Sequence, residues 1–147
     1  MPFNLGHEAD TARKQALAHI DTAAGETRSF FVSPGELTDA EYQQTQRAVE
    51  RWRSNGSPSN DVPSELQSGA KYDGLSIEAE AQKIEQMAAG MELITDAVRT
   101  VRLDAKGQVW AAQGEPNEQA LIAQATKAAD AGYEQIKSNY ADYAKAR

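Results

Sequence analysis

The chain has 147 residues, which suits one domain with a modest core and is short for separate substrate and cofactor domains. Its 22 acidic and 15 basic residues give a formal net charge of −7. This charge argues against a general nucleic-acid binder and against docking on anionic lipid, and the absence of cysteine excludes disulfides, thiol nucleophiles and the common structural zinc sites.

Alanine dominates the apolar part of the composition. The chain has 26 alanines, whereas aromatic residues make up only 7% of it. Alanine is the best helix former and allows close packing, so this composition favours long helices that pack against each other or against a partner. No apolar run approaches the roughly 20 residues of a membrane span, and the first residues lack the order of a signal peptide. We therefore expect a soluble chain that is made in the cytoplasm and does not bind membranes.

Residues 8–32 predict the first helix, because small and apolar residues recur there at steps of three and four. This stripe consists of Ala9, Ala12, Ala16, Ile20, Ala23, Thr27 and Phe30. A Ser-Pro-Gly sequence then predicts a turn. Residues 1–7 form an N-terminal arm with the large apolar residues Phe3 and Leu5. We expect these side chains either to pack onto the first helix, which we favour, or to insert into a neighbouring molecule.

A second helix is expected over residues 38–53. Thr38 and Glu41 have the spacing of a capping box, in which each side chain bonds the other residue's backbone N–H. The expected buried stripe of this helix is Tyr42, Thr45, Val49 and Trp52. Residues 54–62 are rich in turn formers and predict a flexible linker. Pro63 then suits the start of a short helix.

The longest pattern covers residues 76–112, with Ser76 as the expected cap. Apolar residues follow a spacing near 3.5 over more than four heptads, which is the seam of a coiled coil. The seam consists of Ile77, Ala81, Ile84, Ala88, Met91, Ile94 or Thr95, Val98, Val101, Ala105 and Val109. It fits both an intramolecular bundle core and a contact between copies of the chain, and the sequence leaves both interpretations open.

The last helix is expected over residues 116–147. Its stripe is Leu121, Ala125, Ala128, Gly132 or Tyr133, Ile136, Tyr140 and Tyr143. The tyrosines have an apolar body and a polar tip, which suits an interface. Alternation with period two is not sustained anywhere, so we expect no sheet. The predicted fold is an all-α bundle of four to five helices in a single domain, residues 1–147, with one long coiled-coil-like helix.

Side chains for catalysis or metal binding do not converge in the sequence. His7 and His19 are the two histidines, and helical geometry places them about 120° apart, on different faces. Glu78, Glu85 and Glu92 repeat every seven residues but lie off the apolar seam, as expected of a solvated face. A nucleophile elbow and a glycine-rich phosphate loop are both absent. We expect no enzyme, no cofactor and no metal.

The remaining signals point to protein partners. Arg47, Arg51 and Arg53 surround Trp52, but Glu50 interrupts them, so we favour a solvated or partner-facing patch over a grip on nucleic acid. A mimic of DNA is a further option, but it requires acids on one face, and here acids and bases are mixed. The residues we expect to bind a partner are Phe3, Leu5, Trp52, Ala88, Met91, Tyr133, Tyr140 and Tyr143.

The order of motifs over residues 18–112 resembles a helical module in small tail proteins of tailed bacteriophages. There an "ID-AAGE-R" helix, a Pro-Gly turn, a helix starting "EY", an "EAEA" segment and a final "R-L-x-x-K" follow one another. The matching residues are Ile20, Asp21, Ala23, Ala24, Gly25, Glu26, Arg28, Pro34, Gly35, Glu41, Tyr42, Gly74, Ser76, Ala79, Val98, Arg102, Leu103 and Lys106.

In those phages the module is encoded beside, or fused to, tail-fibre and fibre-assembly proteins. The resemblance implies a non-enzymatic structural or adaptor protein of the virion tail, made in the host cytoplasm, with a fibre or baseplate protein or copies of itself as partner. The alternative is a fibre-assembly chaperone that is absent from the mature virion. The family offers no catalytic residues to transfer.

Overall fold

The computed structural model describes residues 4–31 and 39–145, which form six helices and no strand, so the predicted all-α fold is confirmed. The helices are α1 (Asn4–Phe30), α2 (Asp39–Ser54), α3 (Ser64–Asp73), α4 (Ile77–Ala111), α5 (Glu118–Asn139) and α6 (Ala141–Lys145). The chain divides into two compact units: unit 1 comprises residues 1–32 and 93–147, and unit 2 comprises residues 33–92. Helix α4 contributes to both units.

Helix α1 begins at Asn4, so part of the predicted N-terminal arm is helical. Its buried stripe includes Ala9, Ala16, Ile20 and Thr27 as expected, but Arg13 and Ala24 are buried where Ala12 and Ala23 were expected, and the stripe ends at the fully buried Phe31 while Phe30 is exposed. The expectation for Phe30 was therefore wrong, because the step from Thr27 to the next core position is four residues here and not three. The capping residue expected at Thr38 lies outside the described residues.

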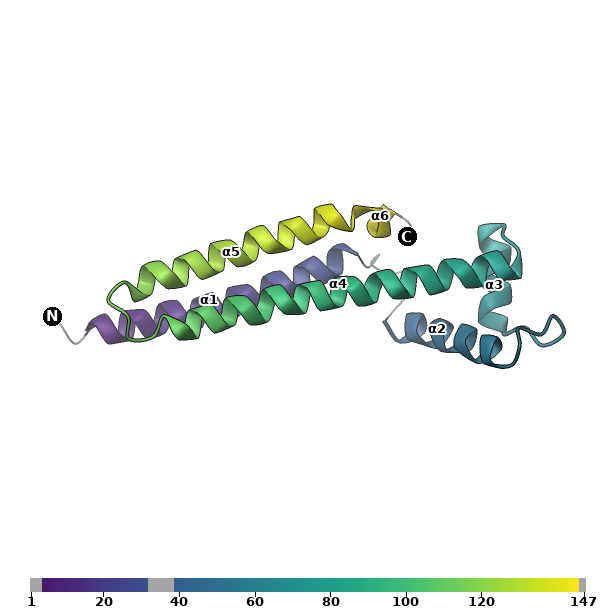
Figure 1. Ribbon diagram of the computed structural model, residues 1–147, viewed down its shortest axis with the longest axis horizontal. Helices are drawn as coiled ribbons and strands as arrows, with labels where there is room; N and C mark the ends of the chain where they lie inside the picture. Colours follow the sequence, from purple (N-terminus) through teal and green to yellow (C-terminus); the bar gives the residue numbers. More distant parts are fainter. Residues whose placement is uncertain (1–3, 32–38, 146–147) are drawn as a thin grey trace. The chain divides into compact units, whose positions relative to one another are not determined.

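Unit 1 consists of three helical segments that lie side by side: α1, α5 and the C-terminal part of α4 (Figure 1). Helices α1 and α5 run in the same direction, since His19 meets Asp130 and, further along, Lys137 meets Phe30. Helix α4 runs the opposite way, because Asp21 of α1 pairs with Lys106 at 3.0 Å while Arg13, earlier in α1, contacts Trp110, later in α4. Polar contacts such as these join the three helices at the edges of their interfaces, and apolar residues fill the space between them.

The core of unit 1 is built from small and β-branched residues. Its members from α4 are Ile94, Val98, Ala105 and Val109, all buried in the single chain. Helix α5 adds Tyr133, whose hydroxyl donates a hydrogen bond to the backbone carbonyl of Ile20 at 3.0 Å. Between α4 and α5, Gly132 lies directly against Val101. The C-terminal half of the predicted seam is therefore intramolecular core.

Unit 2 packs α2, α3 and the first turns of α4 around one apolar cluster. Its buried members are Val49, Trp52, Leu66 and Ala81, and the partly buried Val62, Ile77 and Ile84 pack against them. The Ser76 hydroxyl accepts the backbone N–H of Ala79 at 3.1 Å, so the predicted cap of the long helix is confirmed. Gly74 ends α3 in the left-handed conformation, with φ 70°.

The last predicted helix, residues 116–147, is two helices. Helix α5 ends at Asn139, a weak helix former, and Tyr140 has non-helical backbone angles before α6 begins. The buried stripe also differs from the expected one by one residue, because Ile122 and Ala129 are buried where Leu121 and Ala128 were expected. The short α6 makes the number of helices six and not four to five.

Among the described residues, no helix has both the length and the apolar character that crossing a bilayer requires.

Candidate functional site

The segment of α4 in unit 1 carries a row of exposed apolar side chains, the α4 outer row. Leu93, Leu103 and Trp110 expose 54%, 45% and 53% of their surface. A helix turns about 100° per residue, so these three positions lie within an arc of about 100°. The arc faces away from the buried side of the same segment, where Ile94 and Val98 lie. The row is thus a second apolar face on a helix whose first face already fills a core.

The Trp110 ring stacks against the guanidinium group of Arg13 in α1. The guanidinium carbon of Arg13 lies 5.4 Å from the centre of the indole ring, a cation–π contact. Arg13 is itself buried, donates to Asp10 at 2.8 Å and pairs with Glu118 of α5. Arg13 is held by partners on two helices, so it offers the Trp110 ring a well-positioned cation, and this contact restricts the motion of the ring.

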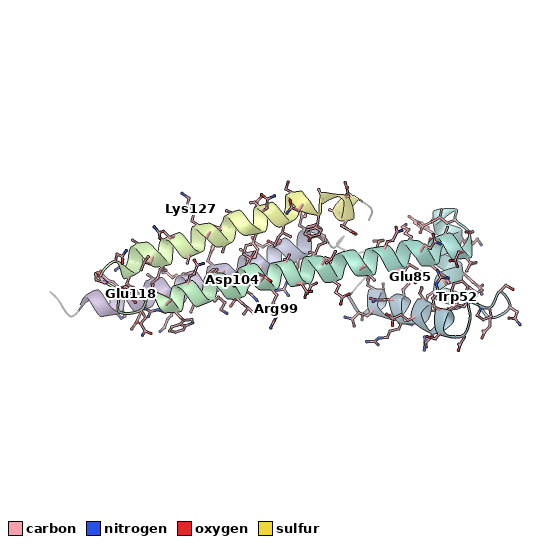
Figure 2. All side chains as sticks on the ribbon, in the orientation of Figure 1. Trp52, Glu85, Arg99, Asp104, Glu118 and Lys127 are labelled. Atoms are coloured by element: carbon pink, nitrogen blue, oxygen red, sulfur yellow. The ribbon has the colours of Figure 1, made fainter. Side chains whose placement is uncertain are left out.

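Charged side chains lie on both sides of the α4 outer row. Arg99 and Asp104, labelled in Figure 2, fall on its two flanks by helical geometry and are exposed. Neither forms an ion pair with another residue in the described part of the chain, whereas Lys106 is taken up by Asp21. Apolar side chains with a charged rim are the arrangement of a protein-binding surface.

In unit 2 the tryptophan and the arginines that the sequence placed together have structural roles. Trp52 is buried, and its indole N–H donates to the carbonyl of Pro58 at 2.9 Å. Arg53 bonds Glu78 at 2.7 Å and Glu85 at 2.9 Å, and it stacks on the Trp52 ring at 5.1 Å. These hydrogen bonds raise the pKa of Arg53 and lower that of Glu78. Trp52 is therefore a core residue and not a side chain presented to a partner.

The tyrosine expectations have different outcomes. Tyr133 is buried against α1, and burial raises the pKa of its hydroxyl, so its predicted role at an interface is corrected to a role in the core. Tyr140 and Tyr143 are half-buried, with ring centroids 6.2 Å apart. Their partner binding stays a prediction.

The other predicted contact residues are less informative. Phe3 and the side chain of Leu5 lie outside the described residues. Ala88 and Met91 are half-buried on α4 within unit 2, and their binding role stays a prediction. The α4 outer row was not among the expected contact residues, although the sequence contains its signal: large apolar residues lie off the seam, on the side expected to face solvent. Other large apolar side chains that are exposed are Phe30, Tyr72 and Leu75.

The histidines do not meet at a common site. His19 contacts Asp130 through Nε2 at 2.8 Å, with both side chains half-exposed, and His7 is exposed at the start of α1. Across the described residues, no group of three or more His, Cys, Asp or Glu side chains is arranged to hold a metal ion.

Neither a protein-family model, nor a curated protein, nor a solved structure matches this chain.

Proposed function

We propose that this chain is a non-enzymatic structural or adaptor protein that acts through helix-mediated contacts with other proteins. The observation that carries the proposal is the α4 outer row, with Leu93, Leu103 and Trp110 about half-exposed on one face. Burying apolar surface gains roughly 25 cal/mol per Å², so covering this row favours association. Large apolar side chains that stay exposed on one side of a helix are a mark of an interaction site.

We place this activity in the tail of a bacteriophage, near the tail fibres or the baseplate. The support for this location is the resemblance of residues 18–112 to the phage tail module. The Trp110 ring that contacts Arg13 and the charged rim of Arg99 and Asp104 support a stable contact with a protein. They do not favour one tail protein over another.

Mass spectrometry of purified virions tests the location. A structural component is expected in washed particles at a constant copy number relative to the tail proteins. A chain that is found in infected cells and in fibre-assembly intermediates but not in virions contradicts the structural role and supports the alternative, a fibre-assembly chaperone.

Variants of the outer row test the contact itself. Leu103→Glu combined with Trp110→Glu is expected to prevent incorporation into particles while the purified chain keeps its helical circular dichroism, because both side chains are exposed. Leu75→Glu is the matched control, since Leu75 is 41% exposed in unit 2 and lies outside the row. Normal incorporation of the double variant would show that the row is not the binding surface.

A further inference from the structure

A carboxyl group is buried where α3 meets the first turns of α4. Glu80 is only 4% exposed, and within the described chain its Oε2 has no hydrogen-bond partner. Its Oε1 lies against α3 at Gly69: a Cβ atom at that position would be 2.8 Å from this oxygen. The glycine therefore makes room for the carboxyl group, which sits inside unit 2 and does not extend into solvent.

Two charged groups act on the Glu80 carboxyl. Asp73, at the end of α3, interacts with it and raises its pKa, and Lys83, one turn further along α4, bonds Asp73 at 3.0 Å. Lys83 is thus the positive charge next to both carboxyl groups. A hydrogen bond between the two carboxyl groups requires that one of them keeps a proton.

The environment assigns that proton to Glu80. Burial, and then Asp73, raise the pKa of Glu80 from 4.5 to about 7. Hydrogen bonds from Lys83 and then Glu80 lower the pKa of Asp73. Asp73 is therefore the carboxylate that accepts, and Glu80 is the acid that donates.

We propose that the contact between α3 and α4 is a proton-controlled latch, closed while Glu80 is protonated and bonded to Asp73 and loosened when Glu80 ionises. Ionisation leaves two carboxylates in contact, one of them buried, which is unfavourable. The loosened element is α3, whose Leu66 belongs to the core around Trp52. Loosening therefore exposes apolar surface of unit 2.

The direction of the pH response follows from the proton balance. The folded state holds a proton that the unfolded state releases above its pKa of 4.5, so unit 2 loses stability as the pH rises from 4.5 to about 7 and then levels off. The folding equilibrium constant of unit 2 is therefore expected to fall by roughly one to two orders of magnitude between pH 5 and pH 8. Residues 33–92 contain no histidine, so no imidazole of unit 2 contributes in this range.

Trp52 provides a local readout. In full-length chain with Trp110→Phe, the remaining tryptophan lies in the core of unit 2. Urea unfolding followed by its fluorescence is expected to show a lower midpoint at pH 8 than at pH 5. Glu80→Gln keeps a donor toward Asp73 without the titration and is expected to remove this difference. Glu92→Gln, at an exposed glutamate of the same helix and unit, is the matched control and is expected to retain it.

Two further measurements test the latch at α3 and at the Glu80 carboxyl group. Amide exchange of Leu66 and Ala70, corrected for intrinsic rates, is expected to be less protected at pH 8 than at pH 5, because the latch acts on α3. The ¹³C shift of the Glu80 carboxyl reports its titration in the unchanged protein even if Glu80→Gln does not fold. A midpoint near 4.5, equal stability at both pH values, or an unchanged pH response in Glu80→Gln would overturn the latch.

Discussion

The glycines of unit 1 give a matched test of how closely its helices pack. Gly107 in α4 and Gly132 in α5 both lie inside helices, where glycine is about 1 kcal/mol less favourable than alanine. They differ in their surroundings: a Cβ atom at Gly107 has nothing within 4 Å, whereas one at Gly132 lies 3.0 and 3.1 Å from the two methyl carbons of Val101. Alanine is therefore a pure propensity change at one site and an overpacking change at the other.

The two alanine variants are expected to differ in their effect on the stability of unit 1. Gly107→Ala should stabilise unit 1 by about 1 kcal/mol, which raises the Tm of a unit of this size by roughly 4–8 °C. Gly132→Ala gains the same propensity but must displace Val101, and overpacking costs about 1–3 kcal/mol. We expect Gly132→Ala to be neutral or up to about 2 kcal/mol less stable than the parent.

Urea unfolding followed by Trp110 fluorescence in a Trp52→Phe background measures both variants on unit 1. Combining Gly132→Ala with Val101→Ala should relieve the crowding, so the two changes together should be less harmful than the sum of their separate effects. If Gly132→Ala stabilises the protein as much as Gly107→Ala does, α4 and α5 do not approach as closely as described here.

Two further predictions concern polar groups in the core of unit 1. Arg13→Ala removes the buried guanidinium that pairs with Glu118 and contacts Trp110. Chemical denaturation is expected to show a loss of roughly 1.5–3 kcal/mol in the free energy of unfolding. An unchanged free energy would mean that the pair behaves like an ion pair at the surface. Tyr133→Phe removes the hydrogen bond to the Ile20 carbonyl without changing the packing, and it should cost about 1 kcal/mol by calorimetry, whereas Tyr133→Leu should cost more because the ring itself fills the core.

Much of the fold could be read from the sequence because it depends on local patterns. The long helix was predicted over residues 76–112 and is Ile77–Ala111, since its cap and its uninterrupted apolar period are both local signals. The one-residue errors at Phe30 and Leu121 arise where the core position is chosen by the facing helix. Propensity and periodicity tolerate either of two neighbouring residues there, and only packing decides between them.

The candidate site was harder to predict because exposure depends on tertiary contacts. Trp52 and Tyr133 looked like interface residues, but each is buried and bonds a backbone carbonyl of the same chain. Trp110 was not among the residues expected to bind a partner, yet its side chain is half-exposed. The sequence does not distinguish an aromatic side chain in a core from one at an exposed interface, because the difference depends on which helices pack around it.

The sequence by itself determined the helical class, the long central helix and the excess of acidic residues, because these follow from composition, period and capping. Tertiary structure decided how the chain divides into two units, of which residues 33–92, with eleven acidic and five basic residues, carry −6 of the total −7. It also decided that the C-terminal half of the α4 seam is core and that a second set of apolar side chains remains exposed. Both outcomes depend on which helix faces meet, and a one-dimensional pattern specifies the faces of a helix but not the neighbours that cover them.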